Sequence, residues 1–112
     1  MARGINLYLQ DIVDSIEKIE QYTSNLFFDA FAKDRKTMDA VVRNLEIIGE
    51  AAKNIPENTK TQHPNIPWQE MIGMRNKVIH EYFGISAEIL WETIKNDIPL
   101  LKASIAALRN KI

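Results

Sequence analysis

The stretch MDAVVRNLEIIGEAAKNI, residues 38–55, is the clearest structural signal in the chain. Its apolar side chains recur at steps of three and four, the spacing of one face of an α-helix. A second apolar row on another side indicates that the helix is central or touches a partner. Gly49 and Ala52 are small enough to let another backbone approach closely, and Pro56 ends the pattern. We therefore predict a central helix over residues 35–54. The first row is Met38, Val41, Val42, Leu45, Ile48, Gly49, Ala52 and Ile55, and the second is Ala40, Ile47 and Ala51.

Similar apolar stripes predict long helices on both sides of this segment. One stripe indicates a helix over residues 4–24 and another a helix over residues 67–82. A third stripe over residues 87–112 keeps its register through Pro99, which predicts one kinked helix. Ser86 precedes this helix as a plausible N-cap, because its hydroxyl can accept a hydrogen bond from the first turn.

The two connecting segments lack a long stripe. Residues 24–36 contain three phenylalanines and read as a turn with a short helical turn. Residues 56–67 are rich in proline, asparagine and threonine and read as a loop with room for one helical turn. Four long helices without a strand pattern predict an all-α fold, an antiparallel bundle of four to five helices in one domain, residues 1–112.

Composition excludes several classes of protein. The 112 residues include no cysteine, which rules out disulfides and cysteine-based zinc sites. No apolar run approaches about 18 residues, so we expect no membrane span. Polar residues interrupt the apolar run after Arg3 too early for a signal peptide, and we expect a cytoplasmic protein. The net charge of −1 lacks the basic excess typical of nucleic-acid binders, so any RNA contact must be local.

Arg75 is the most unusual residue of the predicted third long helix. On a helical wheel, its apolar neighbours lie within about 60° of it, which centres a charge on the apolar stripe. An unpaired buried guanidinium costs several kcal/mol because it cannot lose its proton. We therefore expect Arg75 to pair with Glu46 or Glu50, or to reach the edge of the bundle. Alternatively, it binds a phosphate or another anion.

His80 lies about 140° from Arg75 on the same wheel, in a row with Gly73 and Asn76. Gly73 leaves room for another chain or a ligand to approach the imidazole. A lone histidine near a helix end can equally be a solvated residue without a catalytic role. His63 has no second ligand at metal-binding spacing, so the sequence predicts no metal site and no cofactor.

The segment from Arg75 to Tyr82 reads R-x4-H-x-Y, and it resembles the signature of HepT-like ribonuclease toxins in the HEPN superfamily. The likeness covers nearly the whole chain. It includes the LEIIGEAA stretch of residues 45–52, residues 68–74 leading into the motif, LWET at residues 90–93, and the later DIP of residues 97–99. Nothing in the motif departs from the family pattern.

The resemblance implies a HEPN-like bundle that acts as a metal-independent RNA endonuclease. Arg75 and His80 would be catalytic, with Asn76 in a supporting role. The family likeness also implies a homodimer and a nucleotidyltransferase antitoxin that neutralises the toxin by transferring AMP to Tyr82. The wheel alone places Tyr82 on the apolar stripe, where it could simply be a core tyrosine with its hydroxyl at the rim.

Metal-free cleavage adds a requirement that one chain does not meet. The ribose 2′-hydroxyl attacks the phosphate, so the protein must supply a base, an acid and positive charge. Two chains meeting around Gly73, Asn76 and His80 would bring two imidazoles and two arginines to one cleft. The alternative is a non-catalytic helical module that binds a nucleotide or a partner nucleotidyltransferase, with Arg75 as its anion anchor.

Overall fold

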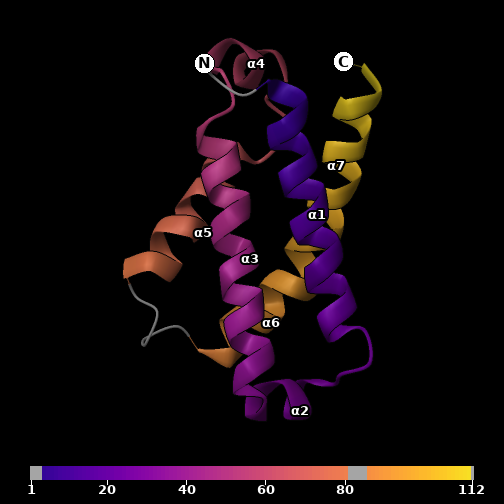
Figure 1. Cartoon of the computed structure of the whole chain (residues 1–112), viewed down its shortest axis with the longest axis vertical. Helices are drawn as coiled ribbons and strands as arrows, with labels where there is room; N and C mark the ends of the chain where they lie inside the picture. The colour runs from indigo at the N-terminus through magenta and orange to yellow at the C-terminus, as the bar shows by residue number, and fades with distance from the viewer. Residues whose placement is uncertain (1–3, 81–85, 112) are drawn as a thin grey trace.

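The computed structural model describes residues 4–80 and 86–111, and every regular element in these ranges is helical. Four long helical runs and two short helices make up the bundle (Figure 1). The elements are α1 (Ile5–Thr23), α2 (Phe28–Lys33), α3 (Arg35–Lys53), α4 (Glu57–Gln62), α5 (Trp68–His80), α6 (Ala87–Glu92), the π-helical segment η2 (Thr93–Asp97) and α7 (Ile98–Lys111). The predicted all-α fold is confirmed.

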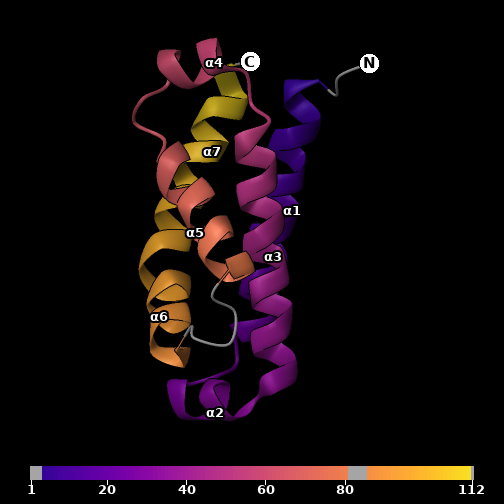
Figure 2. The ribbon, with the colours of Figure 1, turned by 90° about the vertical axis from the view of Figure 1, so that its left-hand side faces the viewer.

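Helix α3 is the centre of the arrangement. It packs most extensively against α5 on one side and α1 on the other, and Figure 1 shows it running between them. Helix α7 packs against α1, and Figure 2 shows α2 at one end of the bundle and α4 at the other. Helix α3 therefore has neighbours on two sides, as expected for a central helix.

The core follows the apolar stripes of the long helices. Leu9, Ile12, Ile19, Val41 and Ile105 are fully buried. The predicted boundaries of the first two long helices agree with the structure within about one residue. The short helices α2 and α4 fall in the two segments expected to hold a helical turn, and the end of the predicted 67–82 helix lies partly outside the described residues.

Pro99 is accommodated by a change of helical register. The chain stays helical from α6 to α7, as predicted, but residues 93–97 form a π-helical turn in which the Ile98 N–H donates to the Thr93 carbonyl. The change of register comes directly before Pro99, the second residue of α7, whose ring nitrogen cannot donate a helical hydrogen bond. Ser86 caps α6 as expected, with its hydroxyl accepting from the Ile89 N–H at 3.2 Å.

Two local contacts set where α3 and α5 begin. The Asp34 carboxylate accepts from the Thr37 N–H at 3.0 Å and from the Thr37 hydroxyl at 2.6 Å, which caps α3. These two hydrogen bonds hold the pKa of Asp34 below its ordinary value of 3.8. The Trp68 indole N–H donates to the His63 carbonyl at 3.0 Å and ties the start of α5 to the end of α4.

Helices α3 and α5 approach each other closely at Gly49. A Cβ atom added there would overlap Arg75 Cβ and lie 2.7 Å from the Met71 carbonyl oxygen. Any side chain larger than hydrogen would therefore push the two helices apart. Gly73 is the opposite case, because a Cβ there would meet no described atom within 4 Å.

No helix in the described ranges is long and apolar enough to cross a membrane.

Replacing Gly49 with alanine should destabilise the fold. The added methyl group has no room against Met71 and Arg75, and overpacking of this kind costs about 1–3 kcal/mol of unfolding free energy. Urea denaturation measures the loss. Gly73→Ala is the matched control within the neighbouring helix and should not lower the unfolding free energy. Equal stability of the two variants would contradict the close packing at Gly49.

Replacing Asp34 with alanine should lower stability in a pH-dependent way. Since the folded-state pKa of Asp34 is depressed, its contribution is present above the unfolded-state pKa and is lost as the pH falls through the folded-state pKa. The difference between the denaturation midpoints of wild type and Asp34→Ala should be largest at neutral pH and should narrow below pH 3.8. Asp34→Asn can still cap but cannot ionise, so its difference from Asp34→Ala should not change with pH. A constant gap between wild type and Asp34→Ala would refute this role.

Candidate active site

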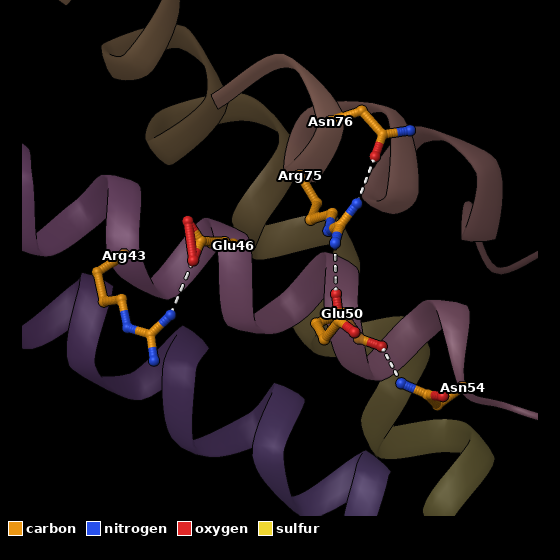
Figure 3. A network of polar contacts seen from close by, with 6 residues as sticks. All are labelled: Arg43, Glu46, Glu50, Asn54, Arg75 and Asn76. Atoms are coloured by element: carbon orange, nitrogen blue, oxygen red, sulfur yellow. Dashed lines mark hydrogen bonds and ion pairs between the residues drawn. The ribbon is translucent and has the colours of Figure 1, made fainter. Parts of the chain in front are cut away.

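Arg75 reaches from α5 toward α3 and is held there by two side chains (Figure 3). Its Nη2 lies 2.9 Å from Glu50 Oε2 on α3, and its Nη1 donates to Asn76 Oδ1 at 2.8 Å. Of the two carboxylates expected to pair with Arg75, Glu50 is therefore the partner. Glu46 instead lies 2.8 Å from Arg43 Nη1, one turn earlier on α3.

The guanidinium of Arg75 keeps unused donors in this arrangement. An arginine carries five N–H donors. Glu50 and Asn76 each accept from one of them, on different terminal nitrogens. The Nε atom is buried and has no hydrogen-bond partner among the described residues. Among residues 4–80 and 86–111, one N–H on each terminal nitrogen is thus without a partner and can face an incoming anion.

Packing around the stem of Arg75 explains why its head lies where it does. The Cβ and Cγ atoms of Arg75 lie directly over Gly49, so the aliphatic part of the side chain fills the space between α3 and α5. The guanidinium then extends beyond the contact, and 23% of the side chain remains exposed. The two expected alternatives both occur, because Arg75 pairs with Glu50 and also reaches the edge of the bundle, but Glu50 is 52% exposed and so is not an internal carboxylate.

A polar pocket opens beside the head of Arg75. It has a volume of about 490 Å³ and is bounded by α1, α3 and α5. Carboxylates, two arginines and several apolar side chains share its wall. The lining residues are Tyr8, Asp11, Arg43, Glu46, Ile47, Glu50, Ala51, Asn54, Arg75 and Ile79. The pocket therefore combines charged groups of both signs with apolar surface, and its cationic groups are Arg43 and Arg75.

The helical wheel placed Arg75 at the centre of the buried face of α5, and this is wrong in detail. Trp68, Met71 and Val78 are buried, but Ile79 is 41% exposed. The buried side of α5 is therefore rotated toward Met71, and Arg75 and Ile79 line the pocket edge. The reason is that α5 packs mainly on α3, so that only one part of its apolar stripe is covered.

The residues that the structure describes also include the predicted site residues Asn76, Gly73 and His80. Asn76 is exposed and contacts Arg75 directly, and Gly73 is exposed on the outer side of α5. His80 is the last residue of α5, five residues after Arg75 and hence about 7.5 Å further along the helix axis. Tyr82 lies outside the described residues.

Sequence reasoning missed the contribution of α1 and of Arg43 to the pocket. Tyr8 and Asp11 come from the first long helix, which carried no chemical motif. A signal for Arg43 was present, since Arg43, Glu46 and Glu50 are spaced by three and four residues and share one face of α3. Which helix faces that row depends on tertiary packing.

A second, apolar groove lies on the other side of α5. It has a volume of about 530 Å³ and runs between α5 and the η2–α7 segment, with α3 beneath it. Gly73, Met74 and Lys77 border it from α5, and Leu100, which is 71% exposed, borders it from α7. The row that includes Gly73 and Asn76 therefore lies next to exposed apolar surface.

Comparison with known proteins places the chain in a family. Residues 12–108 match the family model described as "Ribonuclease HepT-like". A protein of Thermococcus cleftensis named "Probable ribonuclease HepT" is 52% identical over 109 residues, which cover 97% of this chain and 99% of that protein. A "Putative RNase" of Caldanaerobacter subterraneus subsp. tengcongensis is 42% identical over 104 residues, 93% of each chain. No solved structure gives a significant match.

Proposed function

Because the chain belongs to the HepT-like ribonuclease family, we propose that it is an endoribonuclease and that Arg75 and His80 carry its chemistry. The observation that supports this most directly is the environment of Arg75. Its guanidinium lies at the edge of a polar pocket, and one N–H on each terminal nitrogen has no partner among the residues that the structure describes. A planar group with two parallel donors suits a phosphate.

In the proposed reaction the ribose 2′-hydroxyl attacks the adjacent phosphorus. A His80 imidazole takes the proton of this hydroxyl, and Arg75 stabilises the negative charge that develops on the phosphoryl oxygens. The bond to the 5′-oxygen breaks, and a second, protonated imidazole gives that oxygen its proton. The products are a 2′,3′-cyclic phosphate and a 5′-hydroxyl, and no metal ion takes part.

The need for two imidazoles favours a homodimer with a composite site. Each chain carries one histidine within the motif, so the base and the acid would come from different protomers. The apolar groove beside Gly73, with the exposed Leu100 on its border, offers surface for a second copy next to the row of Gly73, Asn76 and His80. Two-fold symmetric dimers are the commonest oligomers, so this arrangement needs no special geometry.

Regulation by a partner completes the proposal. We place the enzyme as the toxin of a toxin–antitoxin pair, neutralised when a nucleotidyltransferase transfers AMP to the Tyr82 hydroxyl. Tyr82 follows His80 by two residues, so an attached AMP would bring bulk and negative charge close to the position of the scissile phosphate. Both effects oppose RNA binding.

A non-catalytic binding module is the second candidate. The observation that favours it is the pairing of Arg75 with Glu50, which already offsets the arginine's charge. The chain's net charge of −1 also gives no general attraction for RNA. In this alternative Arg75 anchors a nucleotide phosphate and His80 has no chemical role.

Cleavage of mixed cellular RNA in excess EDTA tests the proposal. Wild-type protein, verified by mass as unmodified, should cleave, and His80→Ala should lose about 100-fold or more in rate because it lacks the base and acid. Chemical analysis of the ends should find a 2′,3′-cyclic phosphate. No cleavage by folded, unmodified protein across varied RNAs would favour the binding module.

Mixing wild type with an inactive variant tests the composite site within the same assay. Wild-type and His80→Ala proteins, unfolded together in equal amounts and refolded as a mixture, should lose more activity than dilution of the wild type explains, because a mixed dimer carries a single motif imidazole and lacks either the base or the acid. Activity proportional to the wild-type fraction, or a strictly monomeric active enzyme, would overturn the two-chain geometry.

Attachment of AMP to Tyr82 should abolish cleavage. Incubation with ATP and the cognate nucleotidyltransferase should add about 329 Da, the mass of one AMP residue, and reduce RNA cleavage in proportion to the modified fraction. Tyr82→Phe should cleave RNA but resist both modification and inhibition. An active Tyr82→Phe enzyme that is still inhibited by the same treatment would place the modification elsewhere.

A further inference from the structure

We propose that Glu50 is a positioning residue, which acts through Arg75 by holding its guanidinium in the orientation that receives the phosphate. This inference rests on the proposed ribonuclease function and adds to it a residue on a different helix. Glu50 lies on α3, whereas the proposed catalytic residues lie on α5.

Consecutive residues of α3 hold the two ends of the Arg75 side chain. Gly49 lies against Cβ and Cγ of Arg75 and leaves no space for the stem to move toward α3. Glu50 accepts from Nη2 at 2.9 Å (Figure 3). Asn76 accepts from Nη1 on the other side of the guanidinium. With its stem and both terminal nitrogens held, the flexible arginine is restricted to one conformation.

The ion pair between Glu50 and Arg75 contributes little to the stability of the fold, so its main effect is on the position of the guanidinium. The Glu50 side chain is 52% exposed and that of Arg75 is 23% exposed. Pairs with this degree of solvent access add about 0–1 kcal/mol to stability. By contrast, a positively charged group misplaced by about 1 Å can cost on the order of 100-fold in rate. The expected effect of losing Glu50 is therefore on catalysis and not on folding.

The hydrogen-bond donors of Arg75 indicate whether Glu50 positions the guanidinium or competes with the phosphate for it. If Glu50 occupied both terminal nitrogens, a phosphate would have to displace it. Glu50 pairs with Nη2, and Nη1 donates to the neutral Asn76. Each terminal nitrogen keeps one N–H that has no partner in the described part of the chain, so a phosphate can bind Arg75 while Glu50 stays in place.

Steady-state kinetics on an RNA oligonucleotide tests this inference. Glu50→Ala should lower kcat by about 10- to 100-fold with a much smaller change in KM, because the arginine is mispositioned in the transition state. Glu50→Gln keeps an acceptor oxygen and should restore most of the loss. Glu20→Ala is the matched control. It breaks a 2.8 Å ion pair between α1 and α7, away from Arg75, and should leave kcat unchanged.

A double-mutant cycle shows whether Glu50 acts through Arg75. In an Arg75→Ala background, Glu50→Ala should cause no further loss of kcat. Two outcomes would overturn the inference. One is a Glu50→Ala enzyme as fast as wild type or faster, which would mean that Glu50 competes with the phosphate. The other is an equal loss in both backgrounds.

A spectroscopic measurement separates failure of this inference from failure of the proposed function. The buried Nε–H of Arg75 should give a slowly exchanging NMR signal in wild type and Glu50→Gln, and exchange fast in Glu50→Ala. If wild-type protein cleaves no RNA, the ribonuclease proposal fails, and loss of this signal in Glu50→Ala would still support the hold of Glu50 on Arg75. A signal that persists in Glu50→Ala would refute that hold.

Discussion

The close approach of α5 to α3 at Gly49 is the contact on which the candidate site depends. Because no side chain fits at this position, the first atoms of Arg75 can lie directly over the backbone of α3. A larger residue would move α5 outward and carry the arginine with it. The packing of α5 on α3 therefore also determines where the charged side chain of Arg75 lies.

That contact also resolves the conflict between a charge and an apolar interface. The stem of Arg75 contributes apolar surface between the helices, while its head reaches a pocket formed by α1, α3 and α5. Glu50 and Asn76 then each accept one hydrogen bond from a terminal nitrogen. The guanidinium is neither fully buried nor freely solvated, and a fixed cation at the edge of water is well suited to meet a phosphate.

The two sides of α5 serve different purposes in this view. One side carries Arg75 toward the polar pocket, and the other borders an apolar groove with the exposed Leu100. His80 lies at the end of the helix, where the proposed second chain would bring its own copy. A helix that packs mainly on one neighbour leaves surface for both roles, which a fully enclosed helix would not.

The sequence by itself determined the helices and the residues of interest. Apolar spacing predicted α1, α3 and the start of α5 nearly to the residue, because a stripe at steps of three and four is buried in only one conformation. It also singled out Arg75 as a charge among apolar neighbours and limited its partner to Glu46 or Glu50. The R-x4-H-x-Y motif pointed to the family that the comparisons then showed.

Only the tertiary structure decided which alternatives hold. Glu46 and Glu50 lie one turn apart on the same face of α3, and the choice between them depends on where α5 crosses, which Gly49 determines. The rotation of α5 that exposes Ile79, the contribution of α1 to the pocket, and the π-helical turn before Pro99 likewise depend on contacts between distant segments. The spacing of apolar residues shows which side of a helix is apolar. It does not show how far each helix is rotated about its own axis where two helices pack together.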